Sequence, residues 1–398
     1  MTNILKFSIF FLWFSAFFDP IGNLFYFRYI SLVLALFLTF FLIINNKISF
    51  KPNLRWITIL LLSILMPLYG LMIYSVKNIG LEFIDTSYIA AGLILITSLL
   101  YYKSNFLNSG IKALVINARI LSLIILSAFI LDIFFNNNWV SFFTERDIAR
   151  VSFREYGNYK LPYIYFLASP LLIFLISYDY SVYKKNKKLK TISLFLISTL
   201  ALFLSGTRAH MIIAVLFIPI YHLLSISFDF KKIFYFTSIL GAFILIFLLN
   251  SDIKSIIDLF FSVSETSNFH KISMLKVYGK IFSEPANLLI GQGYNAHEWS
   301  YLFRSIISTE IGASKTELTY IEIIRVYGVF VSSLFFVLIS YVVVKLKSSN
   351  REFKWFYIAF LLTLINSSIN PYFFSTNGIL PLCIAISIPL FSSKFNES

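Results

Sequence analysis

Apolar residues fall in blocks of roughly 15 to 25, separated by short polar stretches, and no other feature constrains the fold as strongly. A helix needs about 20 mainly apolar residues to cross the hydrocarbon core of a bilayer. Of the 398 residues, 58% are hydrophobic and only 13% are charged. The blocks predict an all-α integral membrane protein and exclude a soluble enzyme, a disordered chain and a disulfide scaffold. The short alternating strands of an outer-membrane barrel do not fit them.

Twelve transmembrane spans are expected within one polytopic domain covering residues 1–398. They lie at about 5–18, 29–44, 56–75, 87–102, 113–135, 163–178, 191–205, 211–225, 233–250, 319–344, 355–370 and 378–392. Two predicted outer segments are longer than a compact bundle needs, 136–162 and 251–318, the second between spans nine and ten. Long loops usually carry function, so we expect the site in these segments. Cys383, the one cysteine, lies inside an apolar block, which argues against redox or zinc chemistry.

The distribution of basic residues predicts the orientation. With a cytoplasmic N-terminus, the inside segments hold 18 of the 33 basic residues and four of the 19 acidic ones, so the whole net charge of +14 lies there. The positive-inside rule therefore predicts that both termini are cytoplasmic. The lysine-rich run 184–190 is interpreted as a topogenic signal, with contact to anionic lipids as the second possibility, and not as a nucleic-acid site. The N-terminal block lacks a cleavage site and is expected to be a retained span.

Three arginines stand at helical spacing in the shorter outer segment. Arg146, Arg150 and Arg154 would line one side of a helix. With Asp147 and Glu155 close by in sequence, they could form an ion-paired, solvated helix. Alternatively, they could clamp an anion, because guanidinium groups bind phosphate oxygens in a bidentate manner. The spacing favours neither interpretation over the other.

A very short outer turn joins the seventh and eighth predicted spans. Residues Ser205-Gly206-Thr207-Arg208-Ala209-His210 hold Arg208 at the outer membrane boundary, where a lipid phosphate would lie. Interfacial arginines often only extend their charged ends toward water. We favour a functional role for Arg208, because a tight glycine-containing turn leaves it little freedom.

The long loop has its own helical pattern. An interfacial helix is expected at 251–264 and a second helix at 271–281, which Ser283-Glu284-Pro285 ends. A tight glycine turn follows at 288–294. The loop therefore predicts structured, extracytoplasmic helices.

Beyond the glycine turn, His297, Tyr301 and Arg304 are spaced to share one helical face. This face could belong to a surface helix of a lid, since a lone helical histidine is more often structural than catalytic. The alternative is a catalytic histidine, because imidazole titrates near neutral pH.

Ionisable residues open the tenth predicted span. Glu322 and Arg325 are three residues apart and could neutralise each other, whereas Glu317 has no such neighbour. Ionisable groups in a span are costly and indicate function by default. The chain has no phosphate-binding glycine loop, no Asp-x-Asp and no ligand-spaced histidines, so neither a metal nor another cofactor is expected.

Several of these motifs, in this order, resemble the O-antigen polymerase and O-antigen ligase superfamily. Residues 204–209 resemble its serine-arginine motif. The large periplasmic loop of the superfamily resembles residues 271–285, 289–294 and 296–302. Its loop exit resembles Glu317-x-x-Tyr320 followed by Tyr327-Gly328. Glu298 stands where ligases carry Asn, and their later Gly-x-x-Gly is missing, which favours a polymerase. Of the Arg-x(10)-Gly patterns described in polymerases, Arg146 and Gly157 fit one, whereas Lys280 and Gly291 only approach the other.

The resemblance implies a GT-C-like glycosyltransferase in the bacterial cytoplasmic membrane. It would join repeat units carried on undecaprenyl diphosphate into O-antigen or capsule-type polysaccharide on the outer face, without a metal. Its partners would be lipid-linked glycans and membrane lipids, with a chain-length regulator and a flippase nearby. The alternatives are a ligase that transfers glycan to the lipid A core and a lipid-linked oligosaccharide flippase or transporter.

The resemblance also implies roles for individual residues. Arg208 would stabilise the leaving diphosphate, because no metal is available to do so. His297 would be the general base for the incoming sugar hydroxyl, with Glu298 and Glu317 as competing bases. The supporting diphosphate- and glycan-binding residues would be Arg146, Arg150, Arg154, Arg304, Lys280, Tyr301 and Tyr320.

Overall fold

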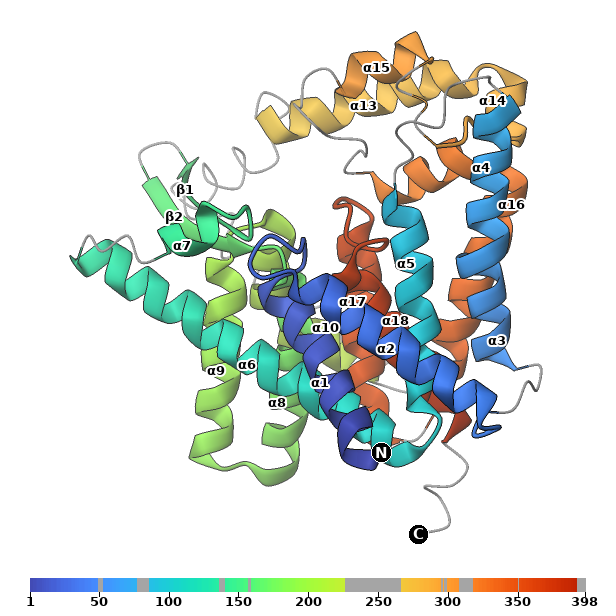
Figure 1. The fold of residues 1–398 in the computed structure, drawn as a ribbon. Helices are drawn as coiled ribbons and strands as arrows, with labels where there is room; N and C mark the ends of the chain where they lie inside the picture. Colours follow the sequence, from blue (N-terminus) through green and yellow to red (C-terminus); the bar gives the residue numbers. More distant parts are fainter. Residues whose placement is uncertain are drawn as a thin grey trace. The chain divides into compact units, whose positions relative to one another are not determined.

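In the computed structural model the described residues are mainly helical, and they contain a single β-hairpin (Figure 1). The described residues are 1–48, 53–76, 86–135, 140–156, 159–225, 266–294, 296, 299–307, 318–349 and 351–391. They belong to two compact units. The first contains Met1–Asn117, Lys271–Phe353 and Thr363–Ser398, and the second contains Ala118–His270 and Lys354–Leu362.

The first unit is helical throughout its described part. Its elements are α1 (Thr2–Phe18), α2 (Phe27–Ile44), α3 (Leu54–Ile59), η1 (Leu60–Leu65), α4 (Met66–Val76), α5 (Thr86–Ile96), η3 (Thr97–Tyr101), the start of α6 (Ser104–Phe135), most of α13 (Thr266–Phe282), α14 (Pro285–Leu289), α15 (Tyr301–Ile307), α16 (Thr319–Lys347), η6 (Arg351–Phe353), the end of α17 (Lys354–Ser367), α18 (Thr376–Ala385) and η7 (Ile388–Leu390). Helix α13 ends and α14 begins at the predicted break, because Pro285 suits the first turn of a helix and not its interior.

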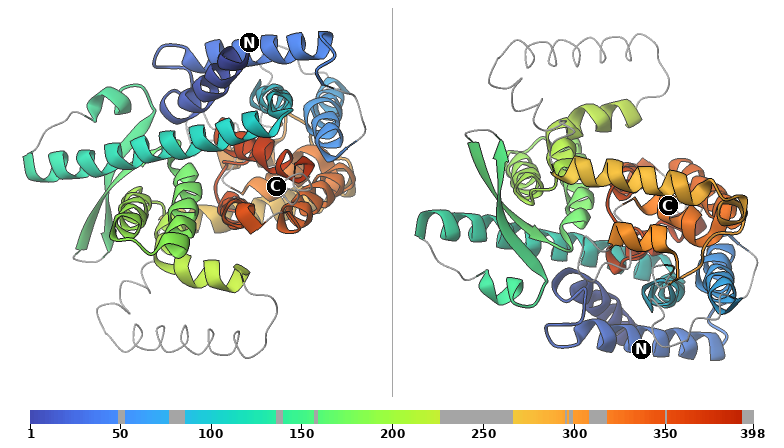
Figure 2. Two further views of the ribbon diagram at one scale, coloured as in Figure 1. Left: turned by 90° about the horizontal axis from the view of Figure 1, so that it is seen from below. Right: turned by 90° about the horizontal axis from the view of Figure 1, so that it is seen from above.

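The second unit combines helices with the hairpin. Its elements are the rest of α6, α7 (Ser141–Thr144), β1 (Ala149–Tyr156), β2 (Tyr159–Phe166), η4 (Ser169–Leu171), α8 (Leu172–Asn186), α9 (Leu189–Leu204), α10 (Arg208–Ser225), the first residues of α13 and most of α17. Strands β1 and β2 are antiparallel, and β2 contacts α9. Figure 2 shows them as one long two-stranded ribbon.

The prediction of twelve spans is wrong. In the described part of the chain, five helices are long and apolar enough to cross a membrane: Phe27–Ile44, Leu54–Val76, Ser104–Leu131, Arg208–Ser225 and Thr319–Lys347. The other apolar helices have 10–17 residues. At 1.5 Å per residue they reach at most about 26 Å, less than the ~30 Å hydrocarbon core. The predicted span 233–250 lies outside the described residues.

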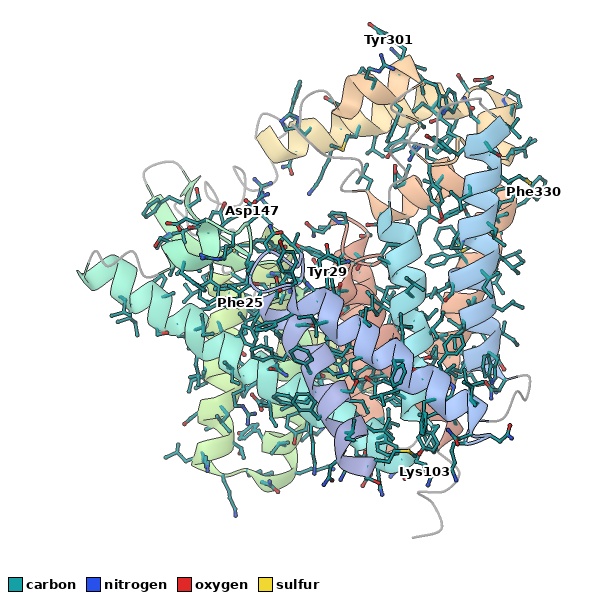
Figure 3. The ribbon with its side chains drawn as sticks, in the orientation of Figure 1. Phe25, Tyr29, Lys103, Asp147, Tyr301 and Phe330 are labelled. Carbon is teal, nitrogen blue, oxygen red and sulfur yellow. The ribbon has the colours of Figure 1, made fainter. Side chains whose placement is uncertain are left out.

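The length and the exposed surfaces of these helices are those of a multi-pass membrane protein. On α2, bulky apolar side chains at helical spacing are exposed, including Val33 at 66% and Phe37 at 66%, whereas Ser31 and Thr39 are fully buried. On α16, Phe330 is 67% exposed, and Figure 3 shows it projecting outward. In water such stripes would be unfavourable, but in a bilayer lipid tails cover them, and the small and polar residues pack between helices.

The predicted sixth span also begins too early. Residues 163–166 belong to β2, and the helix starts only at Leu172. Half of the residues from Tyr159 to Phe166 are aromatic, which suits a strand, and β1 supplies its partner.

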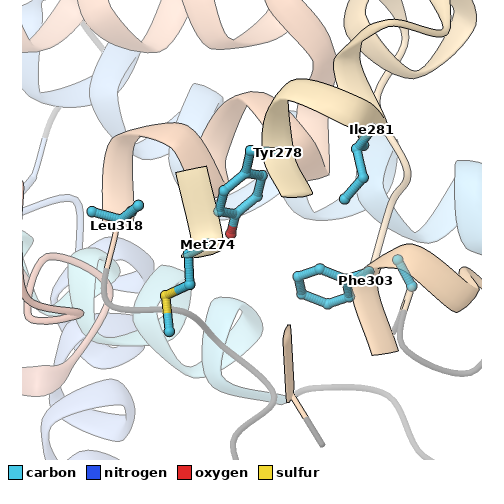
Figure 4. Packing of buried hydrophobic residues seen from close by; sticks show 6 residues of the cluster. Met274, Tyr278, Ile281, Phe303 and Leu318 are labelled. Atoms are coloured by element: carbon cyan, nitrogen blue, oxygen red, sulfur yellow. The ribbon is translucent and has the colours of Figure 1, made fainter. Parts of the chain in front are cut away.

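The long predicted loop has a hydrophobic core of its own in the first unit. Met274, Tyr278 and Ile281 from α13 pack with Phe303 from α15 and with Leu318 just before α16 (Figure 4). These residues recur at helical spacing on α13, so one face of the helix is buried. The predicted helix at 271–281 is therefore confirmed, whereas the one predicted at 251–264 lies outside the described residues.

Candidate functional site

The turn between α9 and α10 is built as the sequence predicts. Gly206 has a φ of +73°, which favours glycine, and the side chain of Thr207 accepts a hydrogen bond from the backbone N–H of His210 at 3.2 Å. Threonine in this position caps the first turn of a helix. Helix α10 therefore begins at Arg208, which holds this arginine at the start of a long apolar helix.

A buried serine and histidine fasten the same turn. Ser205 Oγ lies 2.8 Å from His210 Nδ1 and 2.6 Å from the carbonyl oxygen of Leu202. The hydroxyl has one proton, which it donates to the carbonyl, so Nδ1 of His210 is the donor in the other bond. Both side chains are fully buried. The bond therefore links the end of α9 to the first turn of α10, across the residues that lead to Arg208.

The guanidinium of Arg208 is half-buried and held from a second element. Its Nη1 donates a 2.9 Å hydrogen bond to Oδ1 of Asn268, in the first turn of α13. A turn on one side and a helix on the other therefore restrict this arginine. Such a fixed guanidinium is pre-organised to bind an anion.

The β-hairpin lies directly against this turn. A Cβ atom added to Gly206 would lie 2.1 Å from Cβ of Tyr163 on β2. Tyr163 pairs with Ser152, two positions from Arg150, and residues two apart on a strand share a face. The exposed Arg150 therefore belongs to the hairpin face that meets the turn of Arg208. Within the second unit, Arg150 thus belongs to the hairpin face that abuts the turn leading to Arg208.

The predicted helical stripe of arginines is wrong. Arg150 and Arg154 lie in β1, opposite Tyr165 and Leu161. Arg146 precedes the strand; its Nη1 donates to the carbonyl of Phe142 at 2.8 Å, and its guanidinium lies 4.1 Å from the centre of that ring. A spacing of four residues preserves the face in a helix and also in a strand, so it did not distinguish the two.

In the first unit, the predicted glycine turn is hydrogen-bonded to α16 at the point where this helix is interrupted. Gly291 and Gly293 have φ of +90° and +72°, and α16 is interrupted at Gly328, with a φ of +67°. The N–H groups of Gln292 and Gly293 donate to the carbonyls of Arg325 and Val326 at 2.6 and 3.0 Å. The loop thereby satisfies carbonyl groups that the interruption removes from the helical ladder.

The ionisable pair at the start of α16 neutralises itself, as its spacing suggested. Nε and Nη2 of Arg325 donate to the carboxylate of Glu322 at 2.9 and 2.6 Å, and Tyr278 donates to it at 2.6 Å. The guanidinium also lies 3.8 Å from the centre of the Phe303 ring, and Nη1 donates to the carbonyl of Gly293 at 3.4 Å. Arg325 and Glu322 are both buried. This pair fastens the loop to α16 instead of presenting a charge.

The other predicted residues of the long loop are partly described. Tyr301 begins α15 and is 81% exposed, and Figure 3 shows it pointing away from the ribbon. Arg304 and Lys280 are also exposed. Tyr320 donates to the carbonyl of Leu364 at 2.6 Å, so its phenol holds two helices together.

The three predicted bases, His297, Glu298 and Glu317, lie outside the described residues. Helix α15 begins only at Tyr301, so the proposed continuous face with His297 stays a prediction. Within the described residues, no group of three or more His, Cys, Asp or Glu side chains could hold a metal ion.

Sequence reasoning missed the hairpin and the Ser205–His210 bond. The hairpin had a signal, because Gly157-Asn158 separates two runs rich in aromatic and β-branched residues. The Ser205–His210 bond had none beyond the two residue types in one short turn. In comparisons with protein families, curated proteins and solved structures, the chain matches none of them.

Proposed function

We propose that this protein is a glycan polymerase that joins repeat units carried on undecaprenyl diphosphate at the outer face of a bacterial cytoplasmic membrane. One observation carries the proposal: Arg208 is held at the start of a membrane helix, in a turn that abuts the hairpin face bearing Arg150. A fixed guanidinium, with a second arginine on the hairpin face next to its turn, suits a diphosphate, whose negative charge increases as the sugar leaves.

The chemistry follows from the substrate. The hydroxyl oxygen of the incoming repeat unit attacks the anomeric carbon of the growing glycan, and the bond from this carbon to the diphosphate oxygen breaks. A base takes the hydroxyl proton, and the diphosphate keeps the electron pair. In this proposal His297 is the base, with Glu298 and Glu317 as alternatives, and Arg208 stabilises the leaving group. Holding two lipid-linked glycans together would itself contribute much of the rate.

We also propose supporting roles for the other predicted residues. Arg150 and Arg154 on β1 would contact the diphosphate, and Arg146 would support the start of the hairpin. In the long loop, the exposed side chains of Lys280, Arg304 and Tyr301 would bind glycan. Tyr320 is proposed only to support the loop exit, since its hydroxyl is used by Leu364.

Deletion of the gene and complementation with variants tests the proposal. We expect the deletion strain to carry glycan of one repeat unit, and Arg208→Ala to fail to restore long chains, with Arg208→Lys restoring them poorly because lysine lacks the planar fork. Arg351→Ala is the matched control, an exposed arginine in η6 that is predicted to be cytoplasmic. Normal chain-length ladders from Arg208→Ala, in protein that still inserts into the membrane, would refute the assigned role.

The same deletion separates the alternative functions. Polymer stranded on its lipid carrier would indicate a ligase, and the absence of any repeat unit outside the membrane would indicate a flippase. Either phenotype would overturn the polymerase proposal. Loss of activity in Glu298→Ala or Glu317→Ala, with normal chains from His297→Ala, would reassign the base and leave the reaction unchanged.

A further inference from the structure

Arg55, in the first turn of α3, is a buried guanidinium with almost no protein partner. Among the described residues its side chain makes one hydrogen bond, a long one of 3.4 Å from Nη1 to the carbonyl of Tyr101. Only 6% of the residue is exposed, and Nε is enclosed without a hydrogen-bond partner. No carboxylate among the described residues forms an ion pair with it. Within the described part of the chain, the charge is therefore removed from water without compensation, which is costly.

Arg325 in the same unit is a buried guanidinium whose charge is compensated by a carboxylate. It is buried to a similar degree, with 2% exposed, but two of its nitrogens bind Glu322 and its face covers the Phe303 ring. The two arginines share a chemical type and a degree of burial and differ in their partners. No described residue gives Arg55 the carboxylate that Glu322 gives Arg325.

A second cation follows the contact residue of Arg55 closely in sequence. Lys103 follows Tyr101 by two residues, is exposed, and its Nζ lies 5.5 Å from the centre of the Tyr102 ring. Figure 3 shows Lys103 at the end of the first unit where α2 ends and α3 begins. The exposed Lys47 follows α2 at this end. Positive charge therefore gathers at the end of a membrane-spanning segment, where lipid phosphates lie.

We propose that Arg55 is the core of a phosphate-binding site, with Lys103 as its outer cation, and that the phosphate of an anionic lipid headgroup supplies the missing counter-charge. The enclosed atom is Nε, whereas Nη2 is not enclosed in this way and is the atom through which a phosphate oxygen reaches the guanidinium. This site is separate from the proposed transfer reaction and does not depend on it.

Thermal unfolding of the purified protein in detergent tests the site. Cys383 is the one cysteine and is fully buried, so a thiol-reactive fluorogenic dye reports unfolding. We expect added phosphatidylglycerol to raise the unfolding temperature and phosphatidylcholine to leave it unchanged. Arg55→Met should weaken the apparent affinity for phosphatidylglycerol by about tenfold to a hundredfold, the usual effect of losing a charge-assisted hydrogen bond.

The unfolding temperature of the lipid-free protein gives an independent test. Arg55→Met removes an uncompensated charge and should leave the lipid-free unfolding temperature unchanged or raise it. The matched control Arg325→Met strands Glu322 and should lower this temperature, while the response to phosphatidylglycerol persists. An equal response to inorganic phosphate would support the site and identify the free ion as its ligand.

Two results would overturn the proposal. One is a wild-type protein that responds to neither phosphatidylglycerol nor inorganic phosphate. The other is an Arg55→Met variant that keeps the full response, or that loses as much lipid-free stability as Arg325→Met does.

Discussion

The buried pair of Glu322 and Arg325 allows a quantitative prediction about stability. Arg325→Met removes two short hydrogen bonds to the carboxylate and leaves Glu322 buried at 3% exposure, with Tyr278 as its one remaining donor among the described residues. Breaking one side of a buried ion pair typically costs about 3–5 kcal/mol, because a charge remains uncompensated. We expect this loss in the free energy of unfolding of Arg325→Met, and a loss of similar size for Glu322→Leu.

The double variant provides the decisive comparison. With both charges removed, no buried charge is stranded, although the hydrogen bonds to Tyr278 and Gly293 and the contact with the Phe303 ring are lost. Glu322→Leu combined with Arg325→Met should therefore be more stable than either single variant. The assay is denaturant titration in detergent micelles, followed through the reactivity of the buried Cys383 thiol. If the double variant loses the sum of the two single effects, or if Arg325→Met costs less than about 1 kcal/mol, the pair does not fasten the loop as described.

Three further predictions concern the turn, the broken helix and the orientation. Gly206→Ala should abolish long chains and destabilise the protein by about 2–5 kcal/mol, since the positive φ and the approach to β2 both oppose a Cβ; wild-type melting and ladders would contradict this. Gly328→Ala should destabilise the protein by a similar ~2–5 kcal/mol, because its Cβ would lie 2.2 Å from a backbone oxygen of α14. An unchanged unfolding temperature would show that the glycine turn and α16 can move apart to accept the methyl group. The predicted orientation is tested by labelling in a Cys383→Ala background. A membrane-impermeant maleimide should label Tyr301→Cys in intact cells and Lys187→Cys only after permeabilisation. The reverse pattern would show that the protein has the opposite orientation in the membrane.

The helical elements were predictable because their signals are local and periodic. The apolar face of α13, the proline that starts α14 and the glycines at 206, 291 and 293 each dictate one backbone conformation. The number of spans was not predictable in this way. An apolar block marks burial in lipid or protein, but only the length of the resulting helix decides whether it can cross a bilayer.

The hairpin shows a different limit. Arg150 and Arg154 are four residues apart, a spacing that keeps the same face in a helix and in a strand, so the charges alone could not identify the element. Similarly, Glu322 and Arg325 suggested their own neutralisation, but nothing in the sequence linked them to Tyr278 or Phe303, which come from distant helices. Contacts of this kind depend on packing.

Chain extension by the purified protein in liposomes tests the central claim most directly. The substrate is a single repeat unit on undecaprenyl diphosphate, supplied with a chelator and without nucleotide. We predict a ladder of longer glycans on the lipid carrier for the wild type and no ladder for Arg208→Ala. An unextended substrate with folded wild-type protein, or equal ladders from both proteins, would contradict the account.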